Sequence, residues 1–245
     1  MTDLEVPVQR TLRRLFPGTR LENAFQWPIE SLDALESSFN VQEYLQQLIR
    51  ADRSQVDKLV ELPKGVDDEV WQYEHLRQVC LELGLLVVAL APECTAENCP
   101  EMKAEGWLYL CAAHPATQSC PAIDYIIHTL DGATTLLNNA KYFPSRISVP
   151  EPSLKHFQSI ARRLYRIFAH AYCHHREIYE IFEASNDTSL YARFRLLSRK
   201  YELVPPNLIT IPDSGEEDEE EEEEEGEDGY SRSPRASHST LKETE

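Results

Sequence analysis

Two cysteines in one segment and a group of histidines far downstream constrain the fold of this 245-residue chain more than any other feature. The cysteines are Cys94 and Cys99, a C-x4-C pair, and the histidines are His170, His174 and His175. Two thiolates and two imidazoles make a closed tetrahedral zinc site, and both spacings lie in the range that zinc ligands use. Because 71 residues separate Cys99 from His170, the sequence predicts a structural zinc ion that joins a loop to a distant helix.

Helix geometry leaves the choice of histidines open. On a straight α-helix, His170 and His174 share one face, because residues i and i+4 are neighbours. His170 and His175 are about 140° apart around the same axis, so they converge only if the helix bends or ends there. The spacing alone favours the first pair.

The other four cysteines, Cys80, Cys111, Cys120 and Cys173, are predicted to be buried thiols rather than metal ligands. Cys80 lies on an apolar helical stripe, and the other three have no partner at a ligand spacing. The chain opens without a basic-then-apolar leader, so we expect reduced cysteines. Reduced cysteines favour a metal site over a disulfide framework.

Acidic charge is concentrated at the C-terminal end. The net charge is -18, and residues 213–245, with 15 acidic and 3 basic side chains, carry -12 of it. The run Glu216–Glu225 cannot bury apolar surface to offset the entropy of ordering, so residues 211–245 are predicted to be a disordered acidic tail. The mildly acidic remainder would repel phosphate backbones, which argues against nucleic acid as a partner. Since no stretch approaches about 18 consecutive apolar residues, we expect no membrane-spanning helix.

Apolar residues recur at helical spacing in five segments, which predicts an all-α helical bundle over residues 40–210. The segments carry, in order, Val41 to Ile49, Leu76 to Leu90, Ile123 to Leu137, Leu154 to Ala171 and Leu190 to Tyr201. The apolar run from Trp107 to Cys111 predicts a small strand of one short β-hairpin. Prolines at 7, 17 and 28 interrupt the first 39 residues, which are predicted to be a partly extended arm.

A basic cluster precedes the histidines. Arg162, Arg163 and Arg166 lie off the apolar stripe of one helix, about one turn before His170. Clustered guanidiniums can bind a phosphate group through paired hydrogen bonds. An ordinary solvated basic face has the same pattern, so the pattern alone leaves both interpretations open.

An aromatic residue flanked by carboxylates lies near the beginning of the long second predicted helix. Trp71 lies beside the apolar stripe rather than on it, with Glu69 and Glu74 nearby. If exposed, such a surface would suit a partner helix rich in Arg and Lys. The alternative from the same pattern is a tryptophan that covers the edge of the bundle.

Several segments, in order over about residues 20–210, resemble the Mob family and most closely its phocein branch. They include Val70-Trp71-Gln72-Tyr73-Glu74-His75, Cys94-x4-Cys99-Pro100, Cys111-Ala112-Ala113-His114, Cys120-Pro121-Ala122-Ile123-Asp124-Tyr125, His128-Thr129-Leu130-Asp131-Gly132-Ala133, Lys141-Tyr142-Phe143-Pro144-Ser145-Arg146, and Arg162 to Phe168 through His170 to Arg176. The resemblance implies a Mob/phocein-type helical bundle with one structural Zn²⁺ bound by Cys94, Cys99, His170 and His175. This ligand set contains the second histidine pair rather than the first.

The resemblance also implies a function. It indicates a non-catalytic adaptor or scaffold subunit of a striatin-type phosphatase–kinase complex, which binds sterile-twenty-type kinases and, through Arg162, Arg163 and Arg166, a phosphothreonine peptide. The alternative is a direct co-activator of NDR-type kinases through the face around Trp71. We expect a cytoplasmic protein, with peripheral attachment to Golgi or other internal membranes.

Enzymatic activity is not expected. Four protein ligands leave no open position on zinc for a reacting water. The sequence contains neither an H-E-x-x-H motif nor the Cys-x-x-Cys pattern of zinc deaminases.

Overall fold

A computed structural model describes residues 15–20, 23–24, 27–185 and 189–212. The chain divides into two units, Met1–Pro206 and Asn207–Glu245. All of the predicted acidic tail beyond residue 212 lies outside the described residues. The predicted domain limits at residues 39 and 210 therefore stay predictions.

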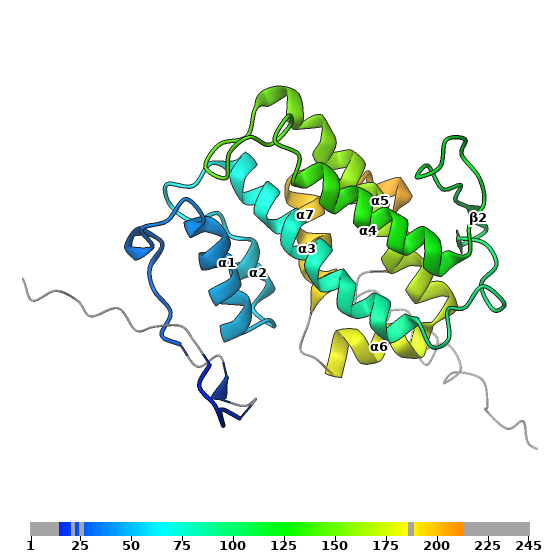
Figure 1. Ribbon diagram of the computed structural model, residues 1–245, viewed down its shortest axis with the longest axis horizontal. Helices are drawn as coiled ribbons and strands as arrows, with labels where there is room; N and C mark the ends of the chain where they lie inside the picture. Colours follow the sequence, from blue (N-terminus) through cyan, green and yellow to red (C-terminus); the bar gives the residue numbers. More distant parts are fainter. Residues whose placement is uncertain (1–14, 21–22, 25–26, 186–188, 213–245) are drawn as a thin grey trace, which may run out of the picture. The chain divides into compact units, whose positions relative to one another are not determined.

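The described part of the chain is mostly helical, as the sequence predicts (Figure 1). Its α-helices are α1 (Asn40–Ala51), α2 (Val56–Val60), α3 (Asp68–Leu90), α4 (Ala122–Leu137), α5 (Lys155–His174), α6 (Arg176–Ser185) and α7 (Leu190–Lys200). Short 3-10 turns are η2 (Leu32–Ala34), η3 (Glu151–Ser153) and η4 (Pro206–Leu208). The five predicted helical segments correspond to α1, α3, α4, α5 and α7. None of the described helices has the length and apolar character that would let it cross a membrane.

Helix α3 occupies the centre of the bundle. It packs against α1, α4, α5, α6 and α7, and Figure 1 shows α4 lying alongside it. Leu76, Leu83 and Leu86 are fully buried, but Trp71 and His75 on other faces are buried too. Neighbours on several sides explain why its apolar residues extend beyond a single stripe.

A separate apolar cluster lies where α1 and α2 meet the start of α3. Its buried members are Val41, Leu45, Ile49, Leu59, Val70 and Trp71. Leu32 of η2 packs against this cluster. The N–H of Glu30 donates a hydrogen bond to Oε1 of Gln47, 2.9 Å away. Glu30 and Leu32 of the predicted arm therefore contact the helical body.

A buried ion pair joins α3 to α7. Nη2 of Arg193 lies 2.7 Å from Oε1 of Glu82, and the two residues are 1% and 6% exposed. Burying charges is costly unless they are paired, so this contact fixes how α7 packs on α3.

A loop and a small hairpin separate α3 from α4. Strands β1 (Lys103–Ala104) and β2 (Trp107–Leu108) pair antiparallel, with Ala104 opposite Trp107. Glu105 and Gly106 both have positive φ, 45° and 78°, which is the requirement of a two-residue type I′ turn. The predicted strand is confirmed but is shorter than Trp107 to Cys111.

Candidate metal centre and basic surface

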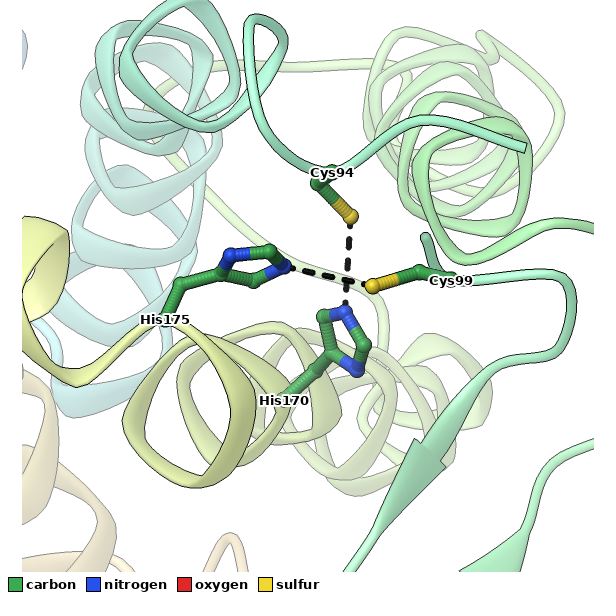
Figure 2. A group of neighbouring side chains, drawn as sticks. All are labelled: Cys94, Cys99, His170 and His175. Carbon is green, nitrogen blue, oxygen red and sulfur yellow. Dashed lines mark hydrogen bonds between the residues drawn. The ribbon is translucent and has the colours of Figure 1, made fainter. Parts of the chain in front are cut away.

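Cys94, Cys99, His170 and His175 converge on one buried point, and we call them the first Cys/His group. Their ligand atoms all lie within 4.8 Å of one another, and Figure 2 shows the four side chains directed at a common centre. Sγ of Cys94 is 3.4 Å from Nε2 of His170, and Sγ of Cys99 is 3.4 Å from Nε2 of His175. A tetrahedral zinc ion with ordinary bond lengths places sulfur and nitrogen about 3.5 Å apart. The distances fit such an ion.

Backbone turns after α3 bring the two thiols together. The N–H of Cys94 donates to the carbonyl of Leu90 at 2.8 Å, and the N–H of Cys99 donates to the carbonyl of Thr95 at 2.8 Å. The Asn98 side chain closes the loop by donating to the carbonyl of Glu93. The C-x4-C spacing is thus the span of one compact loop, and both thiols lie on its buried side.

The end of α5 decides which histidine joins the group. The helix ends at His174, and His175 leaves the helical conformation with φ -139° and ψ 50°. His175 is buried, whereas His174 remains in the helix and is exposed. The preference for His174 from straight-helix spacing is therefore wrong, because the helix stops one residue before His175.

His170 is oriented by β1. Its Nδ1–H donates to the carbonyl of Lys103 at 2.7 Å, which leaves the unprotonated Nε2 facing the cysteines. Burial lowers the pKa of His170 to about 4, although the bond to Lys103 opposes the shift. The ring is therefore neutral at neutral pH, and neutral imidazole is the form that binds a metal.

The two thiols need a compensating positive charge to ionise. Burial, together with the neighbouring Cys99, raises the pKa of Cys94 to about 12. A divalent cation reverses this effect, since it deprotonates a coordinating thiol outright. Two buried sulfurs facing two neutral ring nitrogens therefore suit a metal ion.

The three predicted phosphate-binding arginines, hereafter the basic cluster, lie on α5. Arg162 and Arg163 are exposed, and Arg166 is half-buried. Nη1 of Arg166 donates to the hydroxyl of Tyr125 on α4 at 2.7 Å, and its guanidinium carbon lies 4.6 Å from the ring centroid of Tyr109. Arg166 is thus held in place by two aromatic residues next to two exposed arginines.

The surface predicted around Trp71 is not exposed. Trp71 is 0% exposed, and its Nε1–H donates to the carbonyl of Val60 in α2. Glu74 is 2% exposed and forms an ion pair with Arg146, in which Nε lies 2.7 Å from Oε1. Of the three residues predicted to contact a partner, Glu69 alone is partly exposed. The interpretation of Trp71 as an exposed docking residue is wrong, because the segment that contains α2 covers its indole ring.

Sequence reasoning missed a second Cys/His group, formed by Cys111, His114, Cys120 and His128. Their ligand atoms also lie within 4.8 Å of one another. Cys111 and Cys120 are buried thiols as predicted, but they adjoin two histidines and so are not isolated. The Cys111-x2-His114 spacing is a signal that could have indicated this group. Cys80 is buried as predicted, whereas Cys173 is exposed, contrary to the prediction.

Comparison with known proteins identifies relatives over most of the chain. A sequence profile of the Mob1/phocein family matches residues 47–212. MOB kinase activator-like 4 of Drosophila melanogaster is 48% identical over 202 residues, which cover 82% of this chain and 90% of that protein. The MOB-like protein phocein of Caenorhabditis elegans is 46% identical over 204 residues, covering 83% and 91%.

A more distant relative is the DBF2 kinase activator protein MOB1 of Saccharomyces cerevisiae, 28% identical over 162 residues that cover 62% of this chain and 50% of that protein. The family match includes every residue of the first Cys/His group and of the basic cluster. The resemblance to the phocein branch is confirmed by the two more similar relatives. On this evidence the chain belongs to the Mob1/phocein family.

Proposed function

We propose that this protein is a non-catalytic adaptor that regulates kinases and that one structural zinc ion holds its shape. The observation that carries the proposal is the convergence of four buried donors, two sulfurs and two ring nitrogens, in the first Cys/His group. Four protein ligands complete a tetrahedral zinc ion and leave no position for a water or a substrate. The names of the relatives, kinase activators and phocein, support a regulatory role.

Zinc is the metal that this donor set favours. Soft thiolates with imidazoles in a tetrahedral arrangement suit Zn²⁺, whereas Mg²⁺ and Ca²⁺ prefer oxygen ligands. Bound at Cys94, Cys99, His170 and His175, the ion would join the loop after α3 to the C-terminal end of α5. Since these elements belong to different parts of the sequence, the ion would act on the stability of the whole helical unit.

The proposed assembly is a striatin-type phosphatase–kinase complex that contains sterile-twenty-type kinases. Support comes from identity of nearly half with a protein named phocein over most of its length. Affinity purification of the tagged full chain, followed by mass spectrometry, should recover a striatin-type scaffold and sterile-twenty-type kinases. Recovery of NDR-type kinases without a striatin-type scaffold would contradict this assignment. Cell fractionation checks the proposed location, the cytoplasm with peripheral attachment to Golgi or other internal membranes.

The basic cluster is the proposed contact for a phosphothreonine peptide of a kinase partner. Arg162 and Arg163 are exposed, and Arg166 is oriented beside them by Tyr125. A guanidinium has five N–H donors, so the single bond to Tyr125 leaves others for phosphate oxygens. Hydrogen bonds to a charged group contribute about 1.5–3 kcal/mol each, which makes the cluster able to distinguish a phosphorylated from a plain peptide.

The test of this contact replaces the two exposed arginines. R162A/R163A in the full chain should weaken binding of a phosphothreonine peptide at least about tenfold, which corresponds to about 1.4 kcal/mol. Its melting temperature should stay near that of the wild type, because both side chains are exposed. The matched control is K58A/K64A, which removes two exposed positive charges outside the cluster. Equal affinity of the wild type for phosphorylated and plain peptide would reject the phosphate site.

A further inference from the structure

We infer that Cys111, His114, Cys120 and His128 form a second zinc site, separate from the first. Sγ of Cys111 lies 3.5 Å from Nδ1 of His128, and Nε2 of His114 lies 3.0 Å from Sγ of Cys120. The first distance matches the sulfur–nitrogen separation of about 3.5 Å around tetrahedral zinc, and the second needs to open by about half an ångström. Each side chain offers one donor, and the set is again two sulfurs and two nitrogens.

The two imidazole rings are arranged to share one ion. The ring centroids of His114 and His128 are 5.0 Å apart and the ring planes are nearly perpendicular, at 84°. All four ligand atoms lie within 4.8 Å of one another, so both rings turn a nitrogen toward the same space as the sulfurs. A tetrahedral ion would occupy this space with small adjustments of the side chains.

The backbone brings these residues together in a closed loop. The N–H of Cys111 donates to the carbonyl of Gln118 at 2.7 Å, and the N–H of Gln118 donates back to Cys111 at 3.2 Å. Cys120 follows, two residues before the first residue of α4, and His128 lies on α4 itself. The site therefore consists of a loop closed on itself and the helix that the loop leads into.

Burial at this loop is confined to the proposed ligands. Cys111 and Cys120 are 2% and 6% exposed. Between them, residues 112–119 are all exposed except His114, which is half-buried. A loop with so little buried apolar surface lacks the usual source of stability. A metal ion bound by Cys111 and Cys120 at the two ends of the loop and by His114 in its middle would stabilise the loop instead, by cross-linking it.

A disulfide between Cys111 and Cys120 is the main alternative. It would account for the two sulfurs but would give the two histidines no role. Both cysteines are free thiols in the structure. The position of an imidazole nitrogen beside each sulfur favours a metal ion, and the tetrahedral S₂N₂ set favours zinc.

Metal stoichiometry of the full chain tests the second site. We expect two zinc ions per wild-type chain, measured by elemental analysis after purification without chelator, and one in C111S/C120S. Substitution of Co²⁺ for zinc gives a second readout, because the visible absorption of tetrahedral Co²⁺ should fall by about half in this variant. C173S, which removes an exposed cysteine outside both groups, is the control and should retain two ions.

A variant in the exposed loop separates loss of the metal ion from misfolding of the protein. H114Q changes a half-buried residue surrounded by exposed ones, so it should fold, keep the first ion and lose or weaken the second. Hydrogen exchange at residues 111–120 should become faster in both variants. One zinc ion in the wild type that persists in C111S/C120S, or a Cys111–Cys120 disulfide in the non-reduced protein, would overturn the inference. Neither result depends on peptide or kinase binding, so the proposed function is tested separately.

Discussion

The backbone carbonyl of Cys99 accepts a hydrogen bond from the N–H of Ala122, 2.9 Å away. Cys99 belongs to the first Cys/His group, and Ala122 is the first residue of α4, two residues after Cys120 of the second group. One backbone bond thus joins the first cysteine-containing loop to the helix into which the second one leads. A change that opens the first loop is expected to disturb the beginning of α4 as well.

Loss of the first group should unfold the helical unit. C94S removes one of the four donors proposed for zinc, and the remaining three cannot complete a tetrahedral ion. Structural zinc contributes apparent binding energies of about 10–16 kcal/mol in small zinc-dependent folds, comparable with the whole stability of a domain. We expect C94S, or treatment with a strong chelator, to lower the melting temperature sharply in a thermal scan. C173S is the control, and an unchanged melting temperature for C94S would reject the structural role.

The two adjacent histidines should behave differently when each is replaced. His175 is buried, with Nε2 3.4 Å from Sγ of Cys99, whereas His174 is exposed in the last turn of α5. H175A should lose the ion of the first group and destabilise the protein. H174A should bind the metal normally, as measured by elemental analysis. The opposite pattern would show that the end of α5 differs in solution from the structure.

Much of the fold could be predicted from the sequence because long amphipathic helices leave a clear periodic pattern. Cys94, Cys99 and His170, three members of the first Cys/His group, could also be selected, since their spacings lie in the range that zinc ligands use. The final histidine could not be chosen from spacing. That choice depends on where α5 ends, and the residues around His174 contain no Gly or Pro that would mark the end.

The burial of Trp71 depends on tertiary packing that periodicity does not reveal. Helical spacing places Trp71 beside the α3 stripe, but α2 lies over that position and accepts its indole N–H at Val60. Helix α2 has only five residues, too few to show a period. The second Cys/His group was missed for a different reason, because cysteine and histidine alternate along it and only the Cys111-x2-His114 spacing hints at a site.

The buried pair of Glu82 and Arg193 should show strong coupling. R193M would leave the buried Glu82 carboxylate with the neutral Gln78 amide but without its charged partner, and loss of that partner typically costs about 3–5 kcal/mol. The double variant E82L/R193M removes both charges and should recover most of this loss, since apolar replacements of a buried pair are often neutral. Chemical denaturation of the wild type, both single variants and the double variant measures the coupling energy.

An exposed ion pair provides the control for that cycle. Arg176 and Glu180 form an i, i+4 pair on α6 with side chains 43% and 57% exposed. Because water screens exposed charges, E180Q should change the free energy of unfolding by less than about 1 kcal/mol. A similar loss in R193M and E180Q would mean that the Glu82–Arg193 contact does not form in solution.

Glu183 should make the stability of the protein depend on pH near neutrality. Burial raises its pKa from 4.5 to about 7, although two bonds from the N–H of Tyr191 and the charge of Arg193 oppose the shift. The folded state therefore holds this proton more tightly than the unfolded state. The contribution of Glu183 to the free energy of unfolding should fall as the pH rises from about 4.5 to about 7, and it should be fully lost above that range.

E183Q removes this titration while its amide oxygen can still accept the N–H of Tyr191. The stability of E183Q relative to the wild type should therefore increase between about pH 6 and pH 8, by on the order of 1 kcal/mol. Urea denaturation at several pH values measures the difference, and the lower limit of about pH 6 avoids the acid range in which the proposed metal ligands would become protonated. E177Q, on an exposed carboxyl of the same helix, should give a curve parallel to the wild type. A parallel curve for E183Q would show that Glu183 is ionised in the folded protein throughout this range.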